Sequence, residues 1–425
     1  MDHFTQRDGV LHVEDVPISD IAEGVGTPVY VYSQATLERH ARVFRDALDK
    51  AGVGEGKPVH IAFAIKSNPN LGVLRVLANS GYGADVVSAG EMNRALAAGI
   101  APEHIVFSGV GKARWELQAA IEAGVGQINI ELEDEGRLLS ELAVARGVRV
   151  PATLRVNPDV DAGTHAKIST GKAEAKFGVG IDVAPGIYDR LAALPGIEMR
   201  GLAVHIGSQL ADLSPLEAAF GRIGEFVGEL RAGGHLITYV DLGGGLGVPY
   251  REGEHLPTPD DYAAMVARAT KGWDVTLMFE PGRVIAGNAG VLMTRVLYVK
   301  PGARDPFVIV DAAMNDLARP ALYDAWHDFH AVAPRGGRMT ANIVGPVCES
   351  GDTFATRRDI DRVEQDDLAV FRTAGAYGAT MASSYNSRGL VPEVLVSGGR
   401  WAVVADRIHA DDIMAAERVP EWLQD

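Results

Sequence analysis

The feature that most constrains the fold is a regular alternation of helix-like and strand-like segments. From about residue 33 to 285, each stretch with helical periodicity is followed by a short apolar run typical of a buried strand. Eight strands are expected, at 59–65, 84–88, 104–109, 127–131, 151–158, 200–208, 238–245 and 275–283. Eight strands in this order favour a (β/α)8 TIM barrel, and a doubly wound open sheet is the structural alternative.

After residue 286 the composition changes to segments rich in β-branched and aromatic residues. Examples are VLMTRVLYVK, LAVFRTAGAY and VPEVLVSGGRWAVVAD. The last of these segments contains a Gly-Gly turn between two strands. We interpret them as a C-terminal all-β domain, which GTPVYVYS near the N-terminus is expected to join. The predicted domains are therefore the barrel, 33–285, and a β domain made of 1–32 and 286–425.

Composition excludes several classes of function. The 425 residues are 47% hydrophobic and 23% charged, as in an ordinary globular protein, and the length predicts two domains. No apolar run is long enough to span a bilayer, and MDHFTQRDGV lacks the features of a signal peptide. The net charge of -16 argues against nucleic acid or an anionic membrane as a partner. With the single cysteine Cys348, no internal disulfide can form, and the cytoplasm is the expected compartment.

In a barrel, chemistry belongs at the C-terminal ends of the strands. The polar residues expected there are Lys66, Asp85, Ser88, Ser108, Glu131, Arg155, Asn157, His205, Gly243 to Gly245, Glu280 and Arg283. Such residues could be solvated strand exits. A lysine, a histidine, three consecutive glycines and Glu-Pro-Gly-Arg at one face are harder to explain in that way.

Two of these segments indicate a cofactor. In HIAFAIKSNPN, Lys66 directly follows an apolar run, as expected either of a solvated charge or of a partly desolvated catalytic amine. DLGGGLG, 241–247, follows a strand, so its backbone N–H groups could close around an anion, although a flexible turn is the simpler interpretation. A lysine and a phosphate site at a barrel mouth suggest pyridoxal 5′-phosphate, with Lys66 forming the Schiff base.

Two further residues would complete such a site. Glu280 could bond the pyridine nitrogen and keep it protonated, which makes the ring a strong electron sink. His205, at the end of its strand, could lie against the ring face. A hydrogen-bonded core histidine is about as good an interpretation of its spacing.

At this point the chain resembles a known family, the fold-type III pyridoxal-phosphate-dependent decarboxylases, and its motifs are most similar to those of diaminopimelate decarboxylases. AFAIKSNPN resembles the family's cofactor-lysine segment. The later motifs follow in the family's order: HIGSQ, DLGGGLGVPY, EPGR, MNDLARPALY, CESGD and GAYGATMASSYN. Several are weak alone, but together and in order they are highly specific, and the resemblance covers nearly the whole chain.

The resemblance implies roles for the barrel residues. Lys66 would hold the cofactor, and His205 would stack on its ring. Glu280 would bind the pyridine nitrogen, and Asp85 and Arg155 would support the lysine. The phosphate would be contacted by Ser208, Gly243, Gly244, Gly245 and Tyr377, with Gly282 and Arg283 nearby. The resemblance implies no metal.

The resemblance also implies roles for the second domain. Cys348 and Glu349 would reach into the active site of a partner subunit, in a homodimer with shared sites. Cys348 would protonate the α-carbon after carbon dioxide leaves. Arg283, Arg319 and Tyr323 would bind a second carboxylate, Glu349 would take the accompanying ammonium, and Tyr377 would also contact substrate. The expected reaction is decarboxylation of meso-2,6-diaminopimelate to L-lysine and carbon dioxide, the last step of lysine biosynthesis.

Several alternative functions share some of these features. Related decarboxylases act on D-lysine, D-ornithine, L-ornithine or carboxynorspermidine, and the paired arginines argue against simple diamino acids. Alanine racemase shares both domains, but it has Arg opposite the pyridine nitrogen, so Glu280 argues against it. A non-catalytic carrier would lack the second domain, and an antizyme-like protein would be expected to lack Lys66, Cys348 or both. The segment DAGTHAKISTGKAEAKFG, 161–178, is expected to be either a lid over an anionic substrate, with Lys167, Lys172 and Lys176, or a plain exposed loop.

Overall fold

The computed structural model describes residues 2–161, 170–171 and 176–423 and divides the chain into two compact units. The first unit comprises Met1–Leu37, Tyr250–Glu254 and Ala286–Asp425, and the second comprises Glu38–Pro249 and His255–Ile285. Each unit has its own sheet and its own core. Among the described residues, no helix has the length and apolar character needed to cross a membrane.

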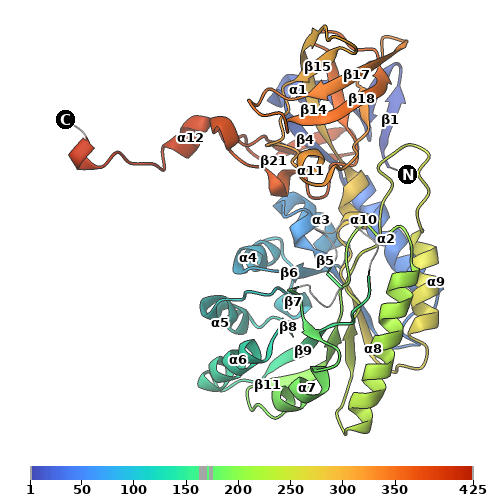
Figure 1. Cartoon of the computed structure of the whole chain (residues 1–425), viewed down its shortest axis with the longest axis vertical. Helices are drawn as coiled ribbons and strands as arrows, with labels where there is room; N and C mark the ends of the chain where they lie inside the picture. Colours follow the sequence, from blue (N-terminus) through green and yellow to red (C-terminus); the bar gives the residue numbers. More distant parts are fainter. Residues whose placement is uncertain (1, 162–169, 172–175, 424–425) are drawn as a thin grey trace. The chain divides into compact units, whose positions relative to one another are not determined.

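The second unit is a closed barrel of eight parallel strands (Figure 1). The strands are β5 (Val59–Ala64), β6 (Gly83–Val86), β7 (Ile105–Phe107), β8 (Gln127–Ile130), β9 (Val150–Asn157), β11 (Ile197–Ala203), β12 (Tyr239–Asp241) and β13 (Thr276–Phe279). Each pairs with the next in this order, and β13 pairs with β5 to close the ladder. The short strand β10 (Val179–Gly180) adds to β9. The predicted barrel is confirmed, and the open sheet is excluded.

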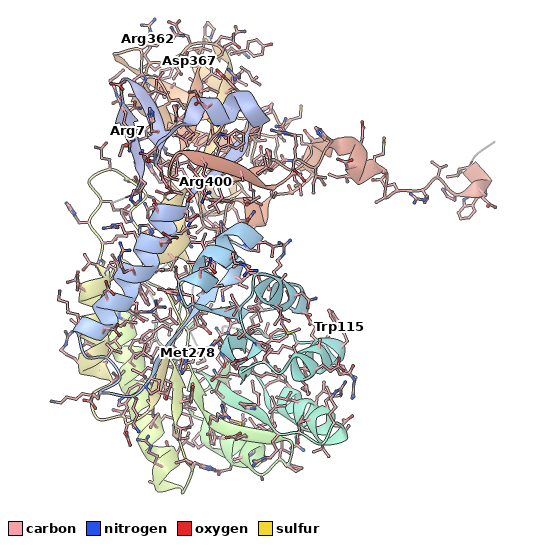
Figure 2. The ribbon with its side chains drawn as sticks, turned by 180° about the vertical axis from the view of Figure 1, so that it is seen from behind. Arg7, Trp115, Met278, Arg362, Asp367 and Arg400 are labelled. Carbon is pink, nitrogen blue, oxygen red and sulfur yellow. The ribbon has the colours of Figure 1, made fainter. Side chains whose placement is uncertain are left out.

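Helices between the strands cover the outside of the barrel (Figure 1). They are α2 (Gln34–Lys50), α3 (Leu71–Asn79), α4 (Ala89–Ala97), α5 (Arg114–Ala123), α6 (Glu133–Ala145), α7 (Ala184–Ala192), α8 (Ser214–Ala232) and α9 (Pro259–Ala269), and the short α10 (Arg283–Ala286) follows β13. Side-chain caps define several starts: Asn70, Ser88 and Thr258 accept backbone N–H bonds at α3, α4 and α9. The outer helix faces meet solvent, as exposed Trp115 on α5 shows (Figure 2).

The barrel interior has an apolar layer and a polar layer. Ala62, Val106 and Met278 pack together inside the barrel. Beyond them, Gln127 and Thr153 both donate to Asn129 Oδ1, at 2.7 and 2.6 Å. Buried polar groups must be hydrogen-bonded, so this layer specifies one arrangement of side chains inside the barrel.

The first unit is built on β strands. A small sheet contains β1 (Phe4–Arg7), β2 (Val10–Val13) and β3 (Val16–Pro17), followed by α1 (Ile18–Val25). The larger sheet contains β4 (Val29–Ser33), β14 (Gly290–Lys300), β15 (Phe307–Val310), β16 (Phe329–Ala331), β17 (Arg338–Val344), β18 (Thr353–Asp361), β19 (Leu368–Phe371), β20 (Glu393–Ser397) and β21 (Arg400–Ala405). The short helices are α11 (Arg319–Tyr323) and α12 (Ala410–Met414).

The GTPVYVYS segment forms the centre of this larger sheet. Its strand β4 pairs antiparallel with β14 and parallel with β20, and its five residues are all buried. Val29, Val31, Val291, Met293 and Val394 contribute to one apolar core beneath the sheet. β-Branched side chains suit such a doubly covered strand, which explains the strong strand signal in the sequence.

A buried ion pair between Lys112 and Glu135 joins the loop before α5 to α6. The Lys112 side chain is fully buried and donates to the carbonyls of Gly109 and Asn129 and to Glu135 Oε1, at 2.8, 2.7 and 2.7 Å. All three ammonium donors are therefore used. Burial raises the pKa of Glu135, although Lys112 acts in the opposite direction.

We predict that Lys112→Met destabilises the barrel by about 3 kcal/mol near neutral pH, because it leaves a buried carboxylate without a cation. Without Lys112 the pKa of Glu135 rises further, so the folded variant gains protons as the pH falls. The deficit relative to wild type should then shrink toward about pH 5. Urea unfolding at several pH values measures this. Lys57→Met removes a surface pair with Asp274 and is the matched control, with almost no expected effect. A Lys112→Met deficit that is absent, or that does not change with pH, would contradict the prediction.

Candidate active site

Lys66 lies at the mouth of the barrel, directly beyond the end of β5. It belongs to a single 3-10 turn, Ile65–Ser67, and its Nζ donates to Asp85 Oδ2 on β6 at 2.7 Å. The Asp85 side chain is fully buried, whereas that of Lys66 is 35% exposed. The amine is thus held on a rigid element with one side open to solvent. Asp85 Oδ1 is also buried, and it has no hydrogen-bond partner among the described residues.

The three glycines of DLGGGLG follow β12 and allow close backbone approach. Gly243 and Gly245 have φ of 67° and 127°, conformations that L side chains rarely adopt. Gly244 is required for space, because a Cβ there would lie 2.2 Å from the Glu280 carbonyl oxygen. The Gly243 N–H donates to Asp241 Oδ1 at 2.9 Å, and the Glu280 N–H donates to the Gly243 carbonyl at 2.8 Å. The loop is therefore built into the barrel mouth.

His205 follows β11 and contacts the glycine loop. Its Nδ1 accepts the Gly244 N–H at 3.1 Å. Burial, with smaller contributions from Lys66 and Arg155, lowers the pKa of His205 well below its usual value. The ring is therefore neutral at physiological pH, with its proton on Nε2, and it can lie against a cationic or electron-poor ring without charge repulsion.

Arg155 on β9 belongs to a buried ion pair. Its NH1 donates to Glu131 Oε1 at 2.8 Å, and the Gly178 N–H donates to Glu131 Oε2 at 2.8 Å. The guanidinium also lies over the Phe177 ring, 4.9 Å from its centroid. Glu131 orients Arg155 in this way, and the pair adds no net charge to the mouth.

Ser208 and Arg283 come together at the barrel mouth. The NH2 group of Arg283, a buried side chain, donates to Ser208 Oγ at 3.3 Å. Gly282 precedes Arg283, and a Cβ at this position would lie 3.1 Å from Ala64 and Ser67. A hydroxyl and a guanidinium beside a loop without side chains form a donor set suited to an anion.

Glu280, at the end of β13, lies among other buried acids. It shares a hydrogen bond with Asp241, and Asp85 also acts on it electrostatically. Burial and these two carboxyls raise the pKa of Glu280 well above its usual value, while Lys66 opposes the shift. This cluster of three acids and one amine can accommodate a further cation.

In the first unit, Arg319 is held in place by two neighbours. Arg319 begins α11, is buried, and its NH1 donates to His327 Nε2 at 2.8 Å. Its guanidinium lies 4.5 Å from the centroid of the Tyr250 ring. Tyr323, at the other end of α11, is half-buried. Packing therefore fixes Arg319 in the unit.

The loop that carries Cys348 is organised by Asp352. This buried carboxylate accepts the N–H groups of Met314 and Val347, each at 2.7 Å. Cys348 is exposed, and its backbone N–H donates to Asn386 Oδ1 at 3.2 Å. The loop thus presents the thiol on the outside of the unit.

Glu349 and Tyr377 lie in the same unit as Cys348. Glu349 is exposed, and its hydrogen bond to Tyr385 is the main cause of the raised pKa of that phenol. Tyr377 is half-buried, with φ of 56° in the left-handed region. This strained conformation at a non-glycine residue is typical of functional loops.

Several residues of these arrangements were not among the predicted site residues. Asp241 opens the glycine motif, Glu131 ends a predicted strand, and Tyr385 lies in a quoted motif, so each had a positional signal. Tyr250 ends the quoted motif DLGGGLGVPY and so had such a signal as well, whereas His327 had none, because its contact with Arg319 depends on the tertiary fold. Most of 161–178, including Lys167 and Lys172, lies outside the described residues, whereas Lys176 is described, with its Nζ 5.4 Å from the Phe177 ring centroid.

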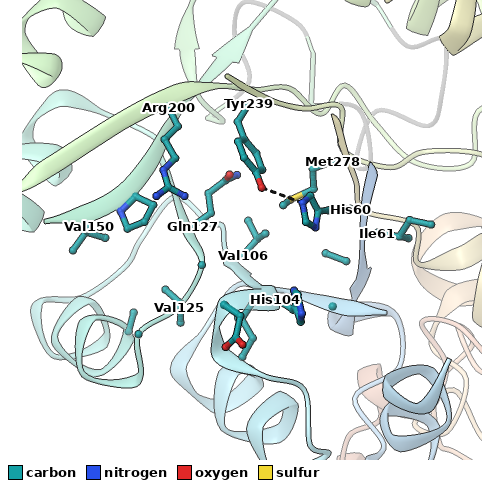
Figure 3. A pocket seen from close by; sticks show the side chains of 18 of the residues that line it. His60, Ile61, His104, Val106, Val125, Gln127, Val150, Arg200, Tyr239 and Met278 are labelled. Carbon is teal, nitrogen blue, oxygen red and sulfur yellow. Dashed lines mark hydrogen bonds between the residues drawn. The ribbon is translucent and has the colours of Figure 1, made fainter. Parts of the chain in front are cut away.

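A cavity of about 680 Å³ lies at the opposite end of the barrel from these residues (Figure 3). It is lined by residues at the N-terminal ends of the strands, among them His60, Gln127 and Tyr239, whose hydroxyl lies 3.0 Å from His60 Nε2. No predicted site residue lines it. The convergence of titratable groups places the candidate active site at the C-terminal ends of the strands.

Comparison with known proteins identifies a family for the whole chain. The family model for the pyridoxal-dependent decarboxylase, pyridoxal binding domain, matches residues 34–287. A diaminopimelate decarboxylase from Zymomonas mobilis is 51% identical, over 99% of both chains. A solved diaminopimelate decarboxylase from M. jannaschii, in complex with L-lysine, is 34% identical with a TM-score of 0.95 over 99% of both chains. One from Helicobacter pylori, also complexed with L-lysine, is 37% identical with a TM-score of 0.89, covering 94% of this chain and 98% of the other.

The match runs through both units, and it includes the segments that carry Lys66, the glycine loop and Cys348. The chain therefore belongs to the pyridoxal-dependent decarboxylases, in the diaminopimelate decarboxylase family.

Proposed function

We propose that this protein decarboxylates meso-2,6-diaminopimelate to L-lysine and carbon dioxide, with pyridoxal 5′-phosphate as cofactor, and so completes lysine biosynthesis. The observation that carries the proposal is the 51% identity to a diaminopimelate decarboxylase over 99% of both chains. The solved relatives complexed with L-lysine, the product of that reaction, support it.

The barrel mouth fits the phosphate end of this cofactor. Gly243 and Gly245, with positive φ, and Gly244, without room for a Cβ, leave the loop bare of side chains next to the Ser208 hydroxyl and Arg283. An anion at that position would meet the Ser208 hydroxyl and the Arg283 guanidinium. Tyr377, on its strained loop, is proposed as a further phosphate and substrate contact.

The mouth also fits the other reactive positions of the cofactor. Lys66 acts electrostatically on both His205 and Glu280. Its amine is therefore the group proposed to bind the aldehyde carbon of the cofactor. Glu280 lies among acids that require a cation, and a protonated ring nitrogen would supply one. His205 is neutral and positioned by Gly244, as needed for stacking.

The bound cofactor supplies the electron sink that takes up the electrons of the broken carbon–carbon bond. Asp85 holds the Lys66 amine when the substrate has displaced it, and so keeps it available for product release. Glu280 maintains the charge of the ring nitrogen. Cys348 delivers the proton to the α-carbon, directly or through water, as a general acid.

Arg319, Arg283 and Tyr323 are proposed to bind the second carboxylate of the substrate. A guanidinium binds a carboxylate through two parallel hydrogen bonds, and His327 and Tyr250 keep that of Arg319 fixed. Glu349 is proposed to bind the accompanying ammonium. A simple diamino acid would leave the arginines without an anionic partner, at a cost of about 1–3 kcal/mol.

We further propose a cytoplasmic homodimer in which each subunit lends Cys348 and Glu349 to its partner. Both residues are exposed in the single chain, as a contribution to another subunit requires. The C-terminal segment extends away from its own sheet (Figure 1) and exposes four large apolar side chains: Met414, Val419, Trp422 and Leu423. A second copy that covered this apolar segment would remove it from water.

Gly244→Ala tests the phosphate site. The new Cβ would collide with the Glu280 carbonyl oxygen, so the loop must shift and its N–H groups turn away. We expect at least about a tenfold loss of cofactor affinity, measured by absorbance titration of the cofactor-free protein. Gly228→Ala, on α8 with open space at the Cβ, is the matched control and should bind the cofactor as wild type does. Unchanged affinity in Gly244→Ala would remove the loop from the phosphate site.

The substrate assignment is tested by carbon dioxide release from the cofactor-loaded protein. The substrates are meso-diaminopimelate, D-lysine, D-ornithine, L-ornithine and L-arginine. We expect kcat/KM for meso-diaminopimelate to exceed the others by at least about a hundredfold, because only it satisfies the arginines. Preference for a simple diamino acid would overturn the second-carboxylate site, and no release from any of the five would overturn the proposed function.

Mixed subunits test the shared site. Lys66→Ala and Cys348→Ala should each have almost no activity alone. If each site combines Lys66 of one chain with Cys348 of the other, one site of every mixed dimer is intact, and equal mixtures should recover about a quarter of wild-type activity. The mixture is made by co-expression and compared with each variant alone. No recovery, with dimers confirmed by light scattering, would place both residues of a site in one chain.

A further inference from the structure

Asp241, which no predicted role includes, connects the two ends of the proposed cofactor site. It is the last residue of β12 and is buried. Its Oδ1 accepts the Gly243 N–H of the phosphate loop at 2.9 Å, and its Oδ2 accepts the Asn129 amide at 3.1 Å. It also shares a hydrogen bond with Glu280, the proposed partner of the ring nitrogen. One carboxyl group therefore contacts both the phosphate loop and the nitrogen anchor.

A hydrogen bond between two carboxyl groups requires a proton on one of them. Asp241 already accepts two N–H donors, which favour its ionised form. Among the described residues, a further side-chain partner of Glu280 is the Ser108 hydroxyl, at a long 3.5 Å. The proton of the pair therefore resides on Glu280, which donates it to Asp241.

The other charged groups around the pair favour the same state. Asp85 on β6 adds a third buried carboxyl, and Lys66 is a cation that acts on Glu280 in the opposite direction. Lys66 donates to Asp85, so its charge is already balanced. The pKa of Tyr262 on α9 is raised mainly by burial and further by Asp241, so this phenol stays neutral. A second free carboxylate would have no counter-charge here.

We propose that Asp241 is a positioning residue that holds Glu280 as a neutral acid in the empty site, so that the ring nitrogen receives its proton from Glu280 rather than from solvent. In this step the O–H bond of Glu280 breaks and its electron pair stays on the carboxylate. The lone pair of the ring nitrogen takes the proton. The net charge of the site does not change. The inference rests on the proposed cofactor and deepens it.

The proposal explains how a deeply buried acid can serve a protonated ring. An ionised Glu280 beside ionised Asp241 and Asp85 would be strongly disfavoured before the cofactor enters. With the proton stored on Glu280, the charge separates only when the nitrogen is in place to share it. Asp241 also ties this step to the phosphate loop through Gly243.

Proton counting during cofactor binding tests the proposal. Cofactor-free protein is titrated with pyridoxal 5′-phosphate near pH 8 in two non-nucleophilic buffers of different ionisation enthalpy, and calorimetry gives the protons taken up. In Asp241→Asn the amide keeps the bond to Gly243, but it cannot hold a proton on Glu280, which then ionises. We expect this variant to take up about one proton more per cofactor than wild type. Asp189→Asn, the same change on the surface of α7, should match wild type.

Glu280→Gln provides a second test that does not depend on Asp241. The amide in this variant has no proton to give, so the ring nitrogen of the bound cofactor stays unprotonated. The number of protons that the variant takes up on cofactor binding should therefore equal that of wild type. In the Glu280→Gln background, Asp241→Asn should add nothing, because the coupling is gone. These comparisons subtract the protons exchanged by Lys66 and the phosphate, which are common to all variants.

Three results would overturn the inference. One is wild type taking up about one proton more than Glu280→Gln, which would mean that Glu280 is ionised in the empty site. Another is Asp241→Asn behaving as wild type does. If Asp241→Asn does not fold, as judged by circular dichroism, the comparison of wild type with Glu280→Gln decides alone. The third result is that wild-type protein does not bind the cofactor at all. That result would overturn the proposed function as well, and so it is distinguishable from the first two.

Discussion

Closure of the parallel ladder between β13 and β5 is the constraint on which the site depends. The pairing of Phe279 with Ile61 places the end of the last strand beside the end of the first. Glu280 and Lys66, distant in the sequence, therefore reach the same mouth, and the Ala64 N–H donates to the Pro281 carbonyl across this junction. In an open sheet the two residues would lie at opposite edges. The barrel is thus a condition for the chemistry as well as a scaffold.

The second constraint is the charge balance of the mouth. Two ion pairs, Lys66 with Asp85 and Arg155 with Glu131, are internally neutral, and the Asp241–Glu280 pair carries the remaining negative charge. Buried charges without partners cost several kcal/mol, so the site selects ligands that complete its pairs. A molecule with an anionic group at one end and a basic nitrogen at the other would complete these pairs, with the anion at the glycine loop and the nitrogen at Glu280.

Much of this organisation could be predicted from the sequence, because strand ends in a barrel converge whatever the details. All eight expected strands are present, and residues placed at their ends, such as Lys66, His205 and Glu280, lie at the mouth. Contacts between side chains could not be predicted. The bond between Asp241 and Glu280 depends on the register of β12 against β13, and the bond between Arg319 and His327 depends on how α11 packs.

The segment Tyr250–Glu254 shows why the boundary between the units could not be read from composition. It follows the glycine loop of the barrel, yet it groups with the β unit. Its residues are held there by cation–π contacts, since Arg319 lies over Tyr250 and Arg251 lies over Trp326, at 4.5 and 4.1 Å from the ring centroids. The chain that forms the glycine loop therefore continues directly into the packing that fixes Arg319. Asp241 at one end of this stretch therefore belongs to the barrel unit and Tyr250 at the other belongs to the β unit, within one sequence motif.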